Sequence, residues 1–324
     1  MGSLTLSVVI PLLNEAGLVT ELIQRTLTAC RSLKVPFEIL VINDGSRDQT
    51  LERLLALSRE HPELRIVDLF RNFGHMAALS AGIGLAKGEV VITMDGDLQD
   101  PPELIPRLFS EWRAGSGIEV VYAQRTSRKE EPLQRWGTGL FYWLLSKTSN
   151  IPIPKQAGTF ALMDRRVVEG LKRMPERNRY IAGLRAWTGA RSASIPYERP
   201  SRSGGKSRVG MAGLFRLART ALLSFSTRPL RWASWLSLAC ALFLLLVGCT
   251  AIGIRLFTNL AVPGWATTTA LIGLMGFAQS LVLSLISEYL ALMGDEIKAR
   301  PLYLVREEFI GGRPVEAPSD GPWA

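Results

Sequence analysis

Short apolar runs alternate with amphipathic stretches along the first hundred residues. The runs are rich in Val, Ile and Leu, as is typical of buried strands, and the stretches between them have the spacing of helices with one apolar face. The apolar runs are 6–13, 37–42, 64–70 and 90–94, and the helical stretches are 14–31, 48–57 and 74–86. Strands that alternate with helices of this length predict βαβ units and a parallel sheet.

The pattern continues less regularly beyond residue 100. A helix is expected at 102–114, a strand at 119–123, and a second strand at 160–163 that leads into a helix beginning near Asp164. An aromatic-rich amphipathic segment at 135–145 and a basic loop at 197–209 complete this part of the chain. We therefore expect an α/β domain with a Rossmann-like, mostly parallel sheet over residues 1–210.

Polar and acidic side chains follow three of the predicted strands. In open α/β sheets, ligands bind beyond the carboxyl ends of the strands, so these side chains are expected along one rim. They are Asn14, Glu15, Asp44, Asp95 and Asp97. Gly96 lets the backbone turn sharply between the two aspartates, which can then point toward one place. Converging carboxylates suit Mg²⁺ or Mn²⁺, and the alternative is an acidic turn after a strand.

Two long stretches near the C-terminus carry no charged residue. Residues 232–254 and 264–287 are each long enough to cross a hydrocarbon core of roughly 30 Å, whereas the core helix of a soluble protein seldom stays apolar on all sides for so long. Arginine and lysine gather on their outer flanks, which places both termini in the cytoplasm. The preceding residues, 211–225, resemble an amphipathic helix that lies either on the membrane surface or on the α/β domain.

Charge and cysteine content narrow the class of protein. The formal net charge is +9, and basic residues are dense from 165 to 231, immediately before the first apolar stretch. This placement favours an anionic membrane surface over nucleic acid as a partner. The three cysteines have no disulfide or metal-binding spacing. The apolar run near the N-terminus is too short for a signal peptide, so the first domain is expected in the cytoplasm.

Several motifs together carry a family resemblance. They are residues 9–15 (VIPLLNE), 41–46 (VINDGS), 71–75 (RNFGH), 94–102 (MDGDLQDPP) and 296–301 (EIKARP). With the apolar tail, they resemble the family 2 glycosyltransferases of GT-A fold. Within that family the chain is most similar to polyprenyl-phosphate glycosyltransferases of the bactoprenol glucosyltransferase type, and more distantly to dolichol-phosphate mannose synthase.

The resemblance implies roles for individual residues. Pro11, Asn14 and Glu15 would line the nucleotide-sugar site, and Asp44 would accept a hydrogen bond from the base. Asp95 and Asp97 would face the diphosphate and the Mg²⁺ or Mn²⁺ ion, with Gln99 completing the metal shell. The residues implied in binding phosphates of donor or acceptor are Arg125, Arg135 and Arg202. Each also has a surface or structural interpretation, and for His75, a candidate base, we favour the structural one.

One stretch departs from the family pattern. Related enzymes usually carry acidic residues where this chain has Gln156 and Thr159, neither of which accepts a proton near neutral pH. A phosphate monoester acceptor is already mostly dianionic at pH 7, because its second pKa is near 6. Its attack depends more on positioning and on stabilising the leaving group than on proton removal. Chemistry can therefore survive this substitution.

These features predict an inverting glycosyltransferase of the inner cell membrane that moves a sugar, with UDP-glucose as the favoured donor, to undecaprenyl phosphate. The expected parts are a cytoplasmic GT-A domain (1–210), a juxtamembrane amphipathic helix (211–231), a two-helix transmembrane hairpin (232–290) and a cytoplasmic C-terminal segment (291–324). Membrane lipid is an expected partner, nucleic acid is not, and assembly into a homo-oligomer stays open.

Two other functions are compatible with the sequence. The first is a processive polysaccharide synthase, but such enzymes need a longer membrane region and a Gln-x-x-Arg-Trp motif, which 134–136 (QRW) matches only with the wrong spacing. The second is a non-catalytic scaffold in a glycolipid pathway, a hypothesis motivated by Gln156 and Thr159.

Overall fold

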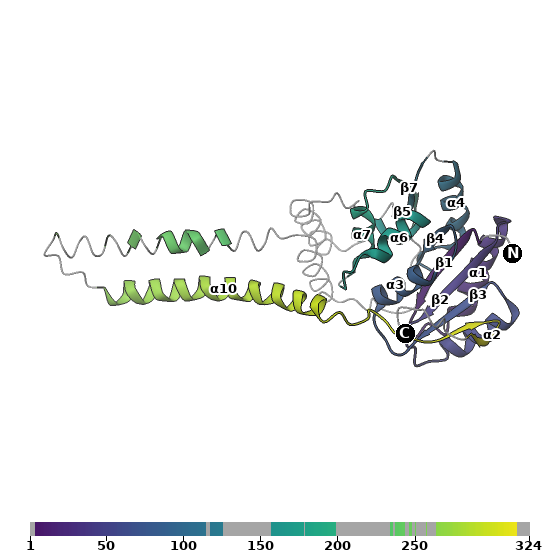
Figure 1. The fold of residues 1–324 in the computed structure, drawn as a ribbon, viewed down its shortest axis with the longest axis horizontal. Coiled ribbons are helices and arrows are strands. Elements are labelled where there is room, and N and C mark those ends of the chain that lie inside the picture. Colours follow the sequence, from purple (N-terminus) through teal and green to yellow (C-terminus); the bar gives the residue numbers. More distant parts are fainter. Residues whose placement is uncertain are drawn as a thin grey trace. The chain divides into compact units, whose positions relative to one another are not determined.

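The computed structural model divides the chain into two compact units (Figure 1). The first comprises Met1–Tyr142, Ile151–Gly210 and Pro301–Ala324, and the second comprises Trp143–Asn150 and Met211–Arg300. The residues that the structure describes are 4–114, 117–125, 157–177, 179–198 and 264–315, with short helical pieces at 234–235, 237–243, 246–247, 250 and 257. Each unit is described by itself below.

The first unit is built on a mixed sheet with the strand order β7-β5-β6-β4-β1-β2-β3-β8-β9. The strands are β1 (Leu6–Leu12), β2 (Phe37–Asn43), β3 (Leu64–Leu69), β4 (Val90–Thr93), β5 (Val120–Arg125), β6 (Ala157–Asp164), β7 (Ser192–Tyr197), β8 (Val305–Ile310) and β9 (Arg313–Val315). Strands β4, β1, β2 and β3 are parallel to one another. Their carboxyl ends therefore form one rim, as the sequence predicts.

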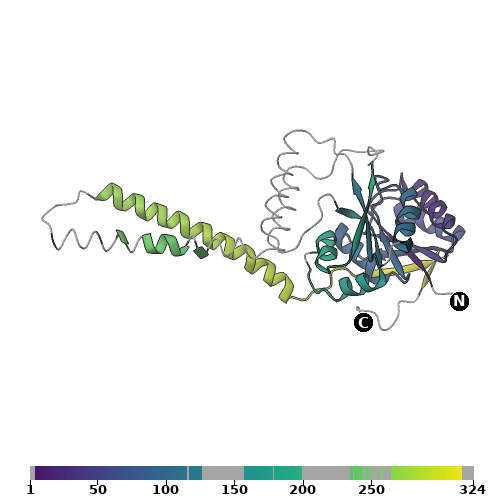
Figure 2. The same ribbon diagram turned by 90° about the horizontal axis from the view of Figure 1, so that it is seen from above.

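Helices cover both faces of this sheet (Figure 2). One layer contains α1 (Val19–Ser32), α2 (Thr50–Glu60) and α4 (Ile105–Ala114), and the other contains α3 (His75–Leu85), α6 (Arg165–Arg173) and α7 (Ile181–Trp187). A short 3₁₀ helix, η1 (Pro102–Leu104), precedes α4. Strand residues point alternately into the two layers, so the central strands are mostly apolar and β1 is buried along its whole length.

The expected elements of the first hundred residues are confirmed, with one shifted boundary. The first helix begins at Val19 rather than at Asn14. The backbone amides of Leu18 and Val19 both donate to the carbonyl of Glu15, which closes a turn ahead of the helix. Asn14 and Glu15 therefore lie on a loop at the rim of the sheet.

Four elements were not expected from the sequence. Helix α7 and strand β7 follow α6, and β8 and β9 come from the segment after the apolar tail. Strand β8 pairs antiparallel with β3, so residues beyond 300 extend the sheet of the first unit. Both β7 and β8 carry many polar residues, because most of their side chains are exposed or half-buried.

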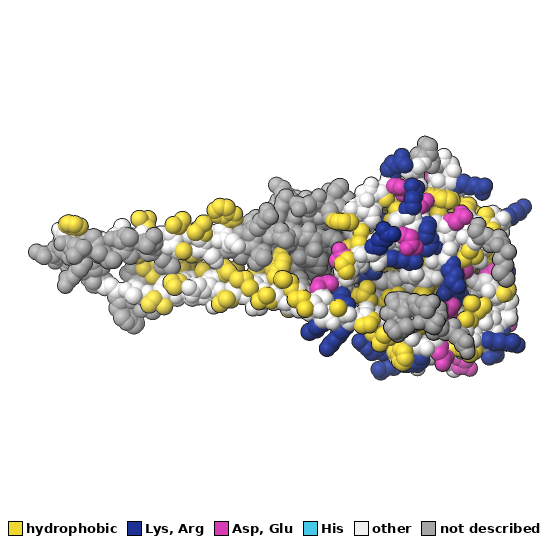
Figure 3. Space-filling view, in the orientation of Figure 1, with side chains coloured by type: hydrophobic (Ala, Val, Ile, Leu, Met, Phe, Trp, Pro, Cys, Tyr) yellow, Lys and Arg dark blue, Asp and Glu magenta, His cyan; other side chains and the backbone are white. Residues whose placement is uncertain are grey.

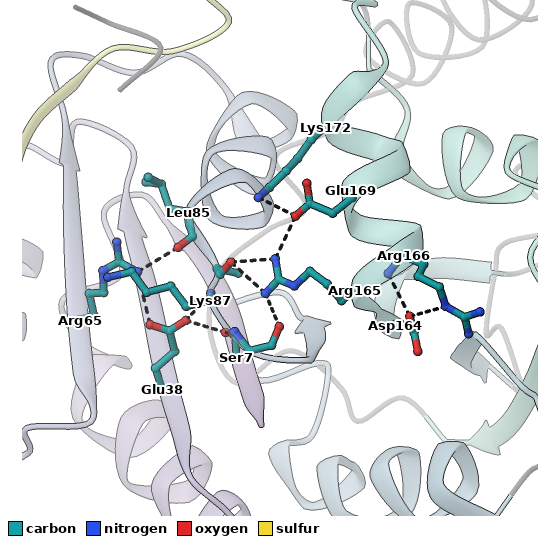
Figure 4. Close-up of polar contacts among 12 residues, drawn as sticks. Ser7, Glu38, Arg65, Leu85, Lys87, Asp164, Arg165, Arg166, Glu169 and Lys172 are labelled. Atoms are coloured by element: carbon teal, nitrogen blue, oxygen red, sulfur yellow. Dashed lines mark hydrogen bonds and ion pairs between the residues drawn. The ribbon is translucent and has the colours of Figure 1, made fainter. Parts of the chain in front are cut away.

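Buried charges join the amino ends of the strands, opposite the rim described above (Figure 4). The carboxylate of Glu38 accepts hydrogen bonds from the Ser7 hydroxyl at 2.5 Å and the Lys87 amide at 2.8 Å, and lies 3.3 Å from the guanidinium of Arg65. Arg65 also pairs with Glu308 of β8 at 2.5 Å. Because Arg65 pairs with a carboxylate of β2 and with one of β8, the network ties β8 to the centre of the sheet.

The second unit contains the long helix α10 (Trp265–Ile297). Its segment Leu271–Ala291 is, within the described residues, the one stretch long and apolar enough to cross a membrane. Large apolar side chains along it are exposed, among them Ile272, Phe277 and Leu283 (Figure 3). The structure describes the other predicted span, 232–254, only in separate pieces. Its described piece at 237–243 shares a small apolar cavity with α10, lined by Cys240, Phe243 and Met275 among others.

Candidate functional site

The turn after β4 carries the two aspartates of the predicted metal site. Leu98 within it has a φ of +59°, a left-handed conformation that costs free energy for a leucine and is often found at functional sites. Asp97 Oδ1 accepts a hydrogen bond from the amide of Gln99 at 3.1 Å. The turn is therefore held in one shape by its own polar groups.

Asp100 supports this turn from beneath. It is fully buried, and its Oδ2 accepts a hydrogen bond from the amide of Asp95 at 3.1 Å. Its Oδ1 accepts one from the hydroxyl of Tyr197, the last residue of β7, at 2.9 Å. Asp100 thus connects the turn after β4 to β7, the strand at one edge of the sheet. The roles of Asp100 and Tyr197 cannot be predicted from the sequence, because residues 97 positions apart give no local signal of their contact.

Asp95 is contacted from two neighbouring elements. Its Oδ1 accepts a hydrogen bond from the hydroxyl of Thr159 on β6 at 2.9 Å and lies 3.3 Å from Nε2 of His75, the first residue of α3. The Asp95 side chain is 24% exposed, so solvent and ligands still reach it. Thr159, at a position where the resemblance leads us to expect an acid, is therefore a hydrogen-bond donor to the predicted metal ligand.

His75 lies within the field of several carboxylates. Burial lowers the pKa of its imidazole, but the hydrogen bond and charge of Asp95, with the charges of Asp44 and Asp100, outweigh burial and raise the pKa above its ordinary value. The side chain remains 44% exposed. A structural role, which the sequence analysis favours, fits this contact, because the imidazole orients and partly neutralises Asp95.

Asp44 follows β2 and organises the loop that leads into α3. It is 3% exposed, and its two oxygens accept hydrogen bonds from the amides of Phe73 at 2.7 Å and Gly74 at 3.0 Å. Burial raises the pKa of its carboxyl, and these two hydrogen bonds only partly offset that effect. A carboxylate oxygen has more than one lone pair, so Asp44 can still accept a further hydrogen bond from a nucleotide base.

The loops after β1 and β2 are joined by hydrogen bonds. The amide of Asn14 donates to the hydroxyl of Ser46 at 3.0 Å, and Asn14 Oδ1 accepts from the amide of Arg47 at 2.8 Å. The amide of Glu15 donates to the hydroxyl of Thr50 at 3.0 Å. These bonds bring Asn14 and Glu15 beside the loop that contains Asp44. Pro11 is buried within β1.

The structure thus brings most of the predicted site residues to one rim. Asp44 and Asp95 both act on His75, and Asn14 and Glu15 border the loop of Asp44. Arg125 ends β5. Arg135, Arg202 and Gln156 lie outside the described residues. The predicted roles of these residues in binding substrates stay predictions.

The chemistry of the rim fits a divalent cation. No group of three or more His, Cys, Asp or Glu side chains is arranged as a metal site in the described part of the chain. Mg²⁺, however, usually takes only one or two protein carboxylates and completes its shell with phosphate oxygens and water. Asp95 and Asp97, half-buried on one turn, match that requirement.

The known proteins that this chain resembles are glycosyltransferases. Residues 7–171 match the glycosyl transferase family 2. An uncharacterized glycosyltransferase of Synechocystis sp. is 41% identical over 313 residues, covering 94% of this chain and 96% of that protein. The SfII prophage-derived bactoprenol glucosyl transferase of Shigella flexneri is 35% identical over 309 residues, covering 94% and 99%. A prophage bactoprenol glucosyl transferase homolog of Escherichia coli is 35% identical over 303 residues, covering 93% and 98%.

Proposed function

Because the chain belongs to glycosyl transferase family 2, and is therefore a glycosyltransferase, we propose that it moves glucose from UDP-glucose to undecaprenyl phosphate. The observation that carries this proposal is the gathering of Asp95, Asp44 and His75 at the carboxyl rim of the sheet, in a chain that matches bactoprenol glucosyl transferases over nearly its full length. This similarity also favours an enzyme over a non-catalytic scaffold.

The donor would occupy the rim across the ends of β1, β2 and β4. Pro11, Asn14 and Glu15 would line the nucleotide, and Asp44 would accept a hydrogen bond from the base. Asp44 is suited to this task because the amides of Phe73 and Gly74 fix its orientation. A buried acceptor held in one orientation favours a base that has a donor in the matching position.

The diphosphate would lie over the turn after β4. Asp95 and Asp97, with Gln99, would hold Mg²⁺ or Mn²⁺, which supplies Lewis-acid stabilisation of the negative charge on the departing nucleoside diphosphate. Thr159 and His75 would keep the Asp95 carboxylate oriented, since both contact its Oδ1. Arg125, Arg135 and Arg202 are proposed to contact phosphates of donor or acceptor.

The acceptor phosphate would attack the anomeric carbon directly, with inversion of configuration. A phosphate monoester is mostly dianionic at neutral pH and needs no general base. This fits a site in which Thr159, a residue unable to take a proton, lies beside Asp95. Holding the two substrates in line would supply most of the rate enhancement.

A membrane location would bring the lipid acceptor to the rim. The exposed apolar side chains of Leu271–Ala291 support one transmembrane helix, and residues 232–254 are proposed as the second. Both termini and the first unit would face the cytoplasm, and residues 211–231 would lie along the membrane surface. Lysine and arginine after α10, at 298 and 300, follow the expected charge bias.

A donor screen tests the proposal. Detergent-solubilised full-length protein is incubated with undecaprenyl phosphate, Mg²⁺ and one radiolabelled nucleotide sugar at a time. We expect labelled lipid with UDP-glucose that disappears when the metal is chelated. Label on the lipid from another donor only would correct the sugar, and no labelled lipid from any common donor would contradict the proposal.

A further inference from the structure

Helix α7 carries an arginine whose charge has no partner to balance it in the described structure. The side chain of Arg185 is 5% exposed. Its Nη2 donates a hydrogen bond to the carbonyl of Gly158 at 3.3 Å, and its guanidinium lies 5.8 Å from the centre of the Tyr122 ring. Its Nη1 is buried and has no hydrogen-bond partner.

A buried guanidinium without a paired carboxylate lowers the stability of the fold. Burial lowers the pKa of the Arg185 guanidinium to about 10, so the side chain still carries its charge at neutral pH. Among the described residues no carboxylate pairs with it. Arg65 is the contrasting case, since that buried guanidinium lies between the carboxylates of Glu38 and Glu308. A charge removed from water without an opposite charge destabilises the fold, which suggests that Arg185 serves binding rather than stability.

The position of Arg185 indicates what it binds. Its hydrogen-bond partner Gly158 immediately precedes Thr159, whose hydroxyl contacts Asp95. Gly158 lies on β6 beyond Ala161, the residue that pairs with Thr93 at the end of β4. Arg185 therefore approaches the same rim as Asp95, from the helix layer that contains α7. Under the proposed function, both substrates bring phosphoryl groups to this rim.

We propose that Arg185 binds a phosphoryl group of a substrate at this rim, through the guanidinium edge that carries Nη1. The group belongs either to the diphosphate of the donor or to the phosphate monoester of the acceptor, and the inference rests on the proposed function. A guanidinium presents several N–H donors in a planar fork that matches two oxygens of one phosphate. Such charge-assisted hydrogen bonds are stronger than neutral ones, and more so away from water.

Replacing Arg185 by methionine separates binding from stability. Methionine has a similar length and no charge, so Arg185→Met is expected to leave the melting temperature unchanged or higher. The same variant is expected to raise the KM for one substrate about 10-fold to 100-fold, as for loss of a charge-assisted contact. Titrating UDP-glucose and undecaprenyl phosphate separately identifies whether donor or acceptor supplies the phosphoryl group. Arg185→Lys keeps the charge but lacks the planar fork of donors. Its KM should lie between those of the wild type and of Arg185→Met.

Arg165 provides a matched control. Its guanidinium donates to the carbonyls of Ala86 and Gly88, so it serves the fold. Arg165→Met should lower the melting temperature and leave both KM values near those of the wild type. The proposal is overturned if Arg185→Met likewise lowers the melting temperature without changing either KM. It is also overturned if Arg185→Met leaves both KM values within twofold of an active wild type.

A binding measurement keeps this test apart from that of the proposed function. If the wild type transfers no sugar, the proposed function fails, and Arg185 is judged by the rise in melting temperature that inorganic pyrophosphate or phosphate produces. A rise in the wild type that is lost in Arg185→Met supports the assignment. Equal rises in both proteins, or none in the wild type, overturn it.

Discussion

The hydroxyl of Thr159 donates a hydrogen bond to Oδ1 of Asp95 at 2.9 Å, which joins β6 to the turn after β4. The backbone beside it is held as well, because the hydroxyl of Thr93 donates to the carbonyl of Thr159. A residue that replaces an expected acid therefore has a defined structural task. It orients the Asp95 carboxylate without adding a second negative charge to the site.

We predict that Thr159→Val lowers kcat roughly threefold to tenfold, which corresponds to one lost hydrogen bond. Valine has nearly the same shape, so the melting temperature should change little. Thr159→Ser retains the hydroxyl and should keep most of the activity. Steady-state kinetics of the two variants test this prediction. Equal kcat values for Thr159→Val and Thr159→Ser would show that the hydrogen bond to Asp95 does not contribute to catalysis.

The pairing of His75 with Asp95 should make stability depend on pH. The pKa of His75 in the folded protein is raised above its value of 6.5 in the unfolded chain. The stabilisation by the charged imidazole is then fully present below about pH 6.5 and is lost as the pH rises through the folded pKa. His75→Gln keeps a hydrogen-bond donor for Asp95 but cannot titrate, so the variant should lack this pH-dependent loss of stability.

The measurement is urea unfolding of wild type and His75→Gln between pH 5.5 and 9 with a chelator present. The difference in unfolding free energy between the two proteins should shrink as the pH rises. Other titrating groups cancel in this difference. A difference that stays constant across the range would contradict the assignment.

Gly45 explains why the VINDGS motif needs its glycine. Its φ is +67°, and a Cβ there would lie 2.5 Å from the backbone carbonyl carbon of Arg71 and the backbone nitrogen of Asn72. We predict that Gly45→Ala lowers the unfolding free energy by at least about 2 kcal/mol, because both the left-handed backbone and the close approach are penalised. Gly17→Ala, where no atom lies within 4 Å, is the control. Equal unfolding midpoints for the two variants in urea would refute this explanation.

Glu308 tests whether the strand after the apolar helix is part of the catalytic unit. Its side chain is mostly buried against Arg65, whereas Glu307 beside it is exposed. Glu308→Gln should cost about 1–3 kcal/mol of unfolding free energy, because Arg65 loses one of its two carboxylate partners. Glu307→Gln should change it by less than about 0.5 kcal/mol. Indistinguishable chemical denaturation curves for Glu308→Gln and Glu307→Gln would argue against a stabilising role of the ion pair between Arg65 and Glu308.

The sequence was sufficient for the part of the fold that local patterns control. Strands β1 to β4 are buried on both faces and are mostly apolar, so their parallel arrangement and the rim of Asp44 and Asp95 could be predicted. Strand β8 has a polar sequence, and its partner β3 lies more than 200 residues earlier in the chain, so no local pattern reveals the pairing.

The same reason limits prediction of the site. Asp95 and Asp97 are separated by one glycine and belong to a motif, so they could be identified. Their supports could not be, because Tyr197 and Thr159 reach Asp100 and Asp95 only through folding. Arg185 belongs to none of the recognised motifs, and its burial next to Gly158 is visible only in the folded chain.

The central claim is that a cation-dependent site at Asp95 and Asp97 transfers sugar to a lipid phosphate. The most direct measurement is transfer of label from UDP-[¹⁴C]glucose to undecaprenyl phosphate by wild type, Asp97→Asn and the surface control Glu103→Gln, with folding checked by circular dichroism. We predict labelled lipid from the wild type and from Glu103→Gln, and none from a folded Asp97→Asn variant. Undiminished transfer by Asp97→Asn, or its absence in the wild type, would contradict the account.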